Sequence, residues 1–129
     1  MRTHLWNLFP IITKEPITVY KVLRGGNAKS TAKSPYQGHI YALGVQEEAY
    51  IEKRLGFWPP RIKIHEGLHA FVDLKNAKNE IWAHARGHHV YECVIPAGSK
   101  IYRGFWDEGG KIPNIVSNKL TVVKIYEEE

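Results

Sequence analysis

Residues 65 to 69 read His-Glu-Gly-Leu-His, which fits the H-E-x-x-H pattern of zinc hydrolases. On an α-helix, His65 and His69 would lie on one face and could bind one zinc ion, while Glu66 would activate a water molecule. Because only helical geometry brings side chains at this spacing to one metal, the chemistry requires a helix through these residues.

The residues around the motif favour a strand instead. Residues 61 to 65 alternate polar and apolar, the period of a strand. Gly67 inside the motif costs a helix about 1 kcal/mol relative to alanine. In a strand, His65 and His69 share a face but lie about 13 Å apart, too far to bind one ion. We therefore expect an extended chain here. Zinc hydrolysis stays an alternative, because Pro60 could begin a helix.

The elements that would position such side chains are mostly strands. Runs rich in β-branched and aromatic residues predict strands at 17–24, 36–44, 89–96, 99–106 and 115–126. Two helices are expected, at 45–57, ended by Gly56, and at 73–87, with Asp73 as N-cap and Gly87 as the stop. The sequence therefore predicts an α+β domain, a mostly antiparallel β-sheet with one or two short packed helices.

The chain has 129 residues, which suits one domain, 1–129. Within it we expect an N-terminal extension, 1–16, and a mobile basic loop, 25–35, rich in glycine, serine and lysine. A single cysteine, Cys93, lies in an apolar run and is expected to be a buried, inert thiol. One cysteine, no apolar span and no signal-peptide pattern together favour a cytoplasmic location without membrane association.

The net charge of +5 favours an anionic partner: a nucleotide, nucleic acid or an acidic protein surface. Solvation of an ordinary basic surface is the alternative. The candidate anion-binding residues are Arg24, Lys29, Lys33, Arg61, Lys63, His84, Arg86, His88 and His89. Trp58 and Trp106 stand beside expected turns and are candidates for stacking on bases.

Several short motifs follow one another in a characteristic order: Y-K-V-L at 20–23, Y-x-x-G at 41–44, G-L-H-x-F at 67–71, L-x-x-A at 74–77, I-P-x-G from Ile95, and V-S-N-K-L at 116–120. This order resembles a family of small uncharacterised phage and prophage proteins, a module also attached to some pentapeptide-repeat proteins. The resemblance covers roughly residues 17 to 126. It implies a phage setting and no established chemistry. The sequence departs from the pattern in its 25–35 loop and its Trp58-Pro59-Pro60 segment.

A second motif set resembles ADP-ribosyltransferase-like folds. Arg24-Gly25 stands at the end of the first predicted strand, and Glu92 precedes the turn Pro96-Ala97-Gly98. The resemblance implies that Arg24 would hold the phosphates of NAD and that Glu92 would stabilise an oxocarbenium-like transition state. The Ser-Thr-Ser and E-x-E signatures of such enzymes are missing.

The sequence thus favours a small phage-type accessory protein that binds an anionic partner without catalysis, with counter-defence against a host as a role suggested by the setting. No cofactor and no metal are expected in this reading. An ADP-ribosyltransferase-like enzyme using NAD is the first alternative, and an H-E-x-x-H zinc hydrolase is the second.

Overall fold

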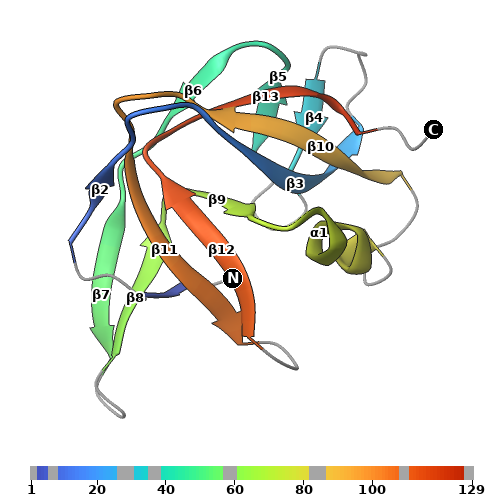
Figure 1. Ribbon diagram of the computed structural model, residues 1–129. Helices are drawn as coiled ribbons and strands as arrows, with labels where there is room; N and C mark the ends of the chain where they lie inside the picture. The colour runs from blue at the N-terminus through green and yellow to red at the C-terminus, as the bar shows by residue number, and fades with distance from the viewer. Residues whose placement is uncertain are drawn as a thin grey trace.

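The computed structural model describes residues 3–5, 9–25, 31–34, 39–56, 61–81, 87–107 and 111–126. In this part of the chain, thirteen strands and one helix follow one another (Figure 1). They are β1 (Thr3–Leu5), β2 (Ile11–Ile12), β3 (Ile17–Gly25), β4 (Thr31–Lys33), β5 (Ile40–Ala42), β6 (Gln46–Glu48), β7 (Glu52–Gly56), β8 (Arg61–Glu66), β9 (Leu68–Phe71), α1 (Leu74–Ile81), β10 (His88–Ile95), β11 (Lys100–Asp107), β12 (Lys111–Ser117) and β13 (Lys119–Ile125).

The strands are linked in the order β6-β13-β10-β3-β9-β12-β11-β1-β8-β7, with β4 and β5 added beside β3 and β2 beside β11. Figure 1 shows β3, β10 and β13 in the upper part of the view and β7, β8, β11 and β12 in the lower part. The link between these two groups is narrow, because β3 and β9 are paired only at Tyr20 and Phe71. All of the strand pairs in the described residues are antiparallel, where a mostly antiparallel sheet was expected.

The main core lies between the two groups of strands. Strand β3 contributes Val19 and Leu23, which are two of its alternate residues and are fully buried. The other strands contribute in the same way; the core cluster also contains Leu68, Ala70, Tyr91, Cys93, Ile95, Ile101, Ile115, Leu120 and Val122. The alternation of buried and exposed residues in the sequence thus comes from strands with one face on a shared core.

Helix α1 confirms the first half of the helix that the sequence predicts over 73–87. Its Ala77 is fully buried and packs in a second, smaller cluster with Val22, Phe71 and Val90. These partners project from β3, β9 and β10, so the helix covers one face of the upper strands near their junction with β9 (Figure 1). Residues 82–86 lie outside the described part of the chain.

The expected α+β class is wrong. The described part of the chain is a β-rich fold, whose one helix has only eight residues. The helix predicted over 45–57 is replaced by β6 and β7, which pair with β13 and β8. The Glu, Lys and Arg residues there have good helix propensity, but two partner strands that satisfy the backbone override such a weak local preference.

Three other segments also differ in detail from the predicted elements. The final predicted strand, 115–126, consists of the last part of β12 and all of β13, with Asn118 between them. Residues 31–33, in the expected basic loop, form β4 between β3 and β5. Within residues 1–16, β1 and β2 both pair with β11. Among the described residues, no helix has the length and apolar character needed to cross a bilayer.

Candidate anion-binding site

The H-E-x-x-H segment runs extended, as predicted. Strands β8 and β9 meet at Gly67, whose φ of 140° bends the chain between them. Strand β8 pairs with β1 and β7, whereas β9 pairs with β12 and β3, so the two halves of the motif belong to different parts of the sheet. The helical geometry that would direct both imidazoles to one zinc ion is therefore absent from the backbone.

Strand register brings three of the predicted anion-binding residues together. Arg24 of β3 lies opposite Lys33 of β4 on one side and opposite His88 of β10 on the other. Residues directly opposite each other in antiparallel strands project from the same face, with Cβ atoms about 5 Å apart. The Cβ atoms of Arg24, Lys33 and His88 therefore lie in a line about 10 Å from end to end. We call this line the cationic row.

The cationic row is accessible at its surface. Arg24 and Lys33 are exposed, and His88 is partly exposed. Arg24 lies beside Gly87, because a Cβ atom built at that glycine would be 3.8 Å from both Cγ and Nε of Arg24. Gly87 has a φ of 91°, and its carbonyl accepts a hydrogen bond of 3.1 Å from the backbone N–H of Gly25. This turn holds the start of β10 against the end of β3, where Arg24 stands.

Acidic residues are absent from the sequence close to the residues of the row. The sequence has no acidic residue between Glu15 and Glu47, and none between Glu80 and Glu92. Among the described residues, neither Arg24 nor Lys33 forms an ion pair. Within the described part of the chain, no carboxylate balances the positive charge of these two side chains.

The structure does not gather all of the predicted residues in the row. Arg61 and Lys63 belong to β8, which is separated from β3 in the sheet order by β9, β12, β11 and β1. His89 lies opposite Leu23, one position from the row, so its side chain starts from the other face of β10. Trp106 is in β11, opposite Ile112. The other candidates, Lys29, Trp58, His84 and Arg86, lie outside the described residues.

A lysine that the sequence analysis did not single out lies inside the fold. Lys21 stands between Val19 and Leu23 on the core-facing side of β3. Its Nζ donates a hydrogen bond to the carbonyl of His69 and lies 5.4 Å from the ring centroid of Tyr41. Burial lowers the pKa of the Lys21 ammonium to about 8, partly offset by the neighbouring Cys93. Its position two residues from both Val19 and Leu23 was the signal that could have identified this lysine as inward-facing.

The hydrogen bond from Lys21 to His69 links the two groups of strands. Beyond the single Tyr20–Phe71 pair, β3 and β9 have no further paired residues, and the ammonium reaches across to the carbonyl of β9. Cys93 is fully buried, as expected, and its thiol donates to the carbonyl of Tyr91 at 3.6 Å. Burial raises the pKa of this thiol to about 12, so the cysteine is not a nucleophile near neutral pH.

We expect Lys21→Met to stabilise the protein by about 1–3 kcal/mol at pH 7, because a methionine of similar length removes the cost of burying a charge. The folded pKa of about 8 lies below the ordinary value of 10.5, so the charged form opposes folding. That cost is fully present below pH 8 and disappears as the pH rises towards 10.5. Urea unfolding at pH 7 and pH 10 should show the variant's advantage shrinking at the higher pH.

Lys75→Met is the matched control, because Lys75 is exposed on α1 and its replacement should leave stability within about 0.5 kcal/mol. A loss of stability in Lys21→Met at pH 7 would contradict this prediction. It would show that the hydrogen bond to His69 outweighs the cost of burying the ammonium.

The geometry gives the transferase alternative no support. Glu92 and Arg24 are on the same face of the β3–β10 ladder, but Glu92 lies opposite Tyr20, four residues from Arg24. Four strand residues correspond to about 13 Å. Val22 and Val90 stand between them under α1, and the Glu92 carboxylate lies 3.9 Å from Nζ of Lys124. To contact both Arg24 and Glu92, the ribose and phosphates of one NAD molecule would therefore have to cross the part of this face that α1 covers.

Comparisons of the chain with protein-family models, with curated proteins and with solved structures found no significant match.

Proposed function

We propose that this protein binds an anionic partner through phosphate groups that sit on the cationic row. The observation that carries the proposal is the strand register, which places Arg24 between Lys33 and His88 on one accessible face. A guanidinium offers a planar pair of donors that matches two phosphate oxygens, and an ammonium adds a compact positive charge. The imidazole of His88 lies at the other end of the row.

The length of the row favours a nucleotide over a polymer as the partner. Three groups within about 10 Å match the oxygens of one or two linked phosphates. An extended nucleic acid would need basic residues that continue along its backbone. Just after β13, which pairs with β10, the last described residue is Tyr126, whose N–H donates to the carbonyl of Val90, and no described basic residue of β13 lies opposite His88. An acidic protein surface is the other candidate that the charge of the segment allows.

The proposal is one of binding and not of catalysis. Among the described residues of the row, the imidazole of His88 is a group that could act as a base, but neither a carboxylate nor a thiol stands beside it. In the phage setting suggested by the motif order, a protein of this kind would suit the sequestration of a host nucleotide signal. Binding alone is sufficient for that role.

Isothermal titration calorimetry with inorganic pyrophosphate, ADP and adenosine tests the proposal. We expect pyrophosphate and ADP to bind and adenosine not to bind, because the phosphates make the contacts. Affinity should fall between about 50 and 200 mM NaCl, since salt screens exposed charges. Absence of binding by both pyrophosphate and ADP at the lower salt concentration would refute the proposal. Binding of adenosine as tightly as ADP would also refute it.

A further inference from the structure

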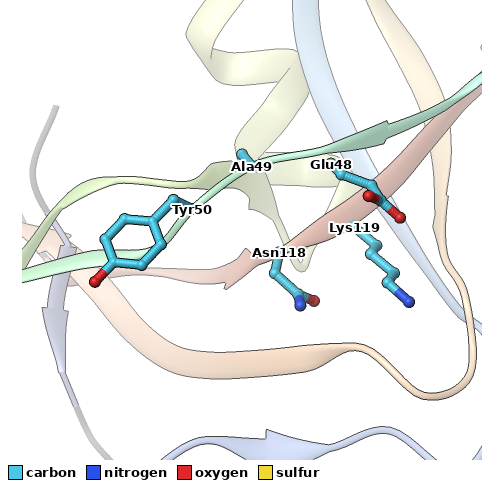
Figure 2. A pocket seen from close by; sticks show the side chains of 5 residues that line it. All are labelled: Glu48, Ala49, Tyr50, Asn118 and Lys119. Carbon is cyan, nitrogen blue, oxygen red and sulfur yellow. The ribbon is translucent and has the colours of Figure 1, made fainter.

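A separate pocket of about 310 Å³ lies at the end of β6 (Figure 2), and none of its lining residues belongs to the cationic row. It is lined by Glu48, Ala49, Tyr50, Asn118 and Lys119. Its volume is at the lower end of the range of small-molecule sites, about 300–1,000 Å³. Figure 2 shows the side chains of Tyr50, Asn118 and Lys119 projecting to the same side of the ribbon.

The backbone around the pocket is fixed by hydrogen bonds. The N–H of Ala49 donates to the carbonyl of Asn118 at 2.9 Å, which joins the two walls. The turn before Lys119 is held by Ser117, whose hydroxyl donates to the carbonyl of Lys119 at 2.7 Å and accepts from its N–H at 3.1 Å. The pocket is therefore formed before any ligand arrives, which lowers the entropic cost of binding.

The orientation of the Asn118 amide is determined by the chain. Its Oδ1 accepts a hydrogen bond of 2.9 Å from the backbone N–H of Lys100, a group that can only donate. The Nδ2 group must therefore present its two hydrogens elsewhere. Within the described part of the chain, Nδ2 of Asn118, Nζ of Lys119 and the Tyr50 hydroxyl have no hydrogen-bond partner. These donors are open to a ligand.

The charges and the ring define the kind of ligand that fits. Glu48 and Lys119 lie directly opposite each other in the β6–β13 pair, so the pocket has one negative and one positive group and no net charge. The side chain of Tyr50 is 81% exposed and offers a flat apolar face. A matching ligand is neutral, has an apolar face, and has groups on its rim that both accept and donate hydrogen bonds.

We propose that this pocket binds the ring of a neutral sugar. A hydroxyl group both donates and accepts, so neighbouring sugar hydroxyls can accept from Asn118 and Lys119 and donate to Glu48. The C–H face of the same ring can cover the exposed ring of Tyr50. A nucleobase could also stack on Tyr50, but it has fewer polar groups on its rim to match a carboxylate, an amide and an ammonium together.

NMR titration of the ¹⁵N-labelled protein with the methyl glycosides of glucose, galactose and mannose, and with N-acetylglucosamine, tests the proposal; adenosine is the comparison ligand. We expect at least one sugar to shift the Asn118 side-chain NH₂ signals and the amides of 48–50 and 117–119. Dissociation constants of about 1–10 mM are expected for so open a site. Asn118→Asp should weaken binding at least about tenfold, because it keeps the acceptor for Lys100 and removes the donors.

Tyr50→Ala is the second variant, and Phe9→Ala is its matched control, since Phe9 is 80% exposed and is not among the pocket residues. We expect the first to abolish the sugar-induced shifts and the second to retain them. The proposal is overturned if no sugar shifts these signals, if Asn118→Asp and Tyr50→Ala both bind normally, or if adenosine binds here and the sugars do not. Since neither phosphate nor the cationic row takes part, failure here leaves the anion-binding proposal unaffected.

Discussion

Arg24→Glu is expected to weaken pyrophosphate binding by about 30- to 100-fold at low salt. Hydrogen bonds to charged groups contribute about 1.5–3 kcal/mol each, and the change replaces such bonds by a repulsion. The new carboxylate would also lie opposite Lys33 and His88 and compete with the ligand for both. The effect should be the largest of any single change in the cationic row, because Arg24 is its centre. Calorimetric titration of both proteins measures it.

Lys14→Glu is the matched control for Arg24→Glu, because it makes the same change of net charge at an exposed residue outside the row. We expect it to alter the affinity less than about twofold at moderate salt, since distant surface charges are screened. Equal losses in the two variants would mean that pyrophosphate responds to total charge and not to a site. The pyrophosphate affinity of Arg24→Lys should lie between those of Arg24→Glu and Lys14→Glu, because lysine keeps the charge but loses the paired donors.

Leu23→Ala is expected to lower the free energy of unfolding by about 2–5 kcal/mol, the usual cost of emptying a buried leucine site. Leu23 is fully buried in the core between the two groups of strands, one residue from Arg24. Arg24→Ala, by contrast, should change stability by less than about 0.5 kcal/mol, because its side chain is exposed. Urea unfolding followed by tryptophan fluorescence gives both values.

The comparison of Leu23→Ala with Arg24→Ala tests which side chains of β3 point into the core and which point to solvent. If Arg24→Ala were as destabilising as Leu23→Ala, the side chain of Arg24 would have to be structural and could not be reserved for a ligand. If Leu23→Ala proved neutral, β3 would not present this face to the core. Pyrophosphate affinity of the folded Leu23→Ala protein should stay close to normal, which separates packing from binding.

The sequence predicts most accurately the strands that are rich in β-branched and aromatic residues. Strands β3 and β10 are such strands, both contribute buried residues on two faces, and both lie close to the predicted ranges. The alternation over residues 61–65 correctly indicated an extended chain where the H-E-x-x-H motif suggested a helix. The segment 45–57 failed because its charged residues look helical locally, whereas the pairing of β6 and β7 with distant strands is not visible in a local window.

The sequence predicted which types of residue form the candidate site, but not which of the candidate residues lie together in it. Arg24, Lys33 and His88 were among nine candidates, and only the register of three strands shows that they are adjacent. A shift of one residue would have placed His89 in the row in place of His88, because side chains alternate between faces. The pairing of Arg24 with His88 joins segments more than 50 residues apart, which composition and spacing do not reveal.

Two features of the structure had weak signals or none. Lys21 could have been recognised as inward-facing from its place between Val19 and Leu23, but a lysine on a core face is rare enough to be overlooked. The β6 pocket combines residues 48–50 with 118–119, and no motif connects these segments. The pocket could therefore be recognised only from the three-dimensional structure.

The central claim is that one row of three residues binds phosphate, and NMR mapping of a pyrophosphate titration tests it most directly. The account predicts that the backbone amides of Arg24, Lys33 and His88 shift together along one binding curve, while those of Arg61 and Lys63 in β8 stay unchanged. Shifts spread over all basic segments in proportion to their charge, or confined to segments outside the row, would contradict it.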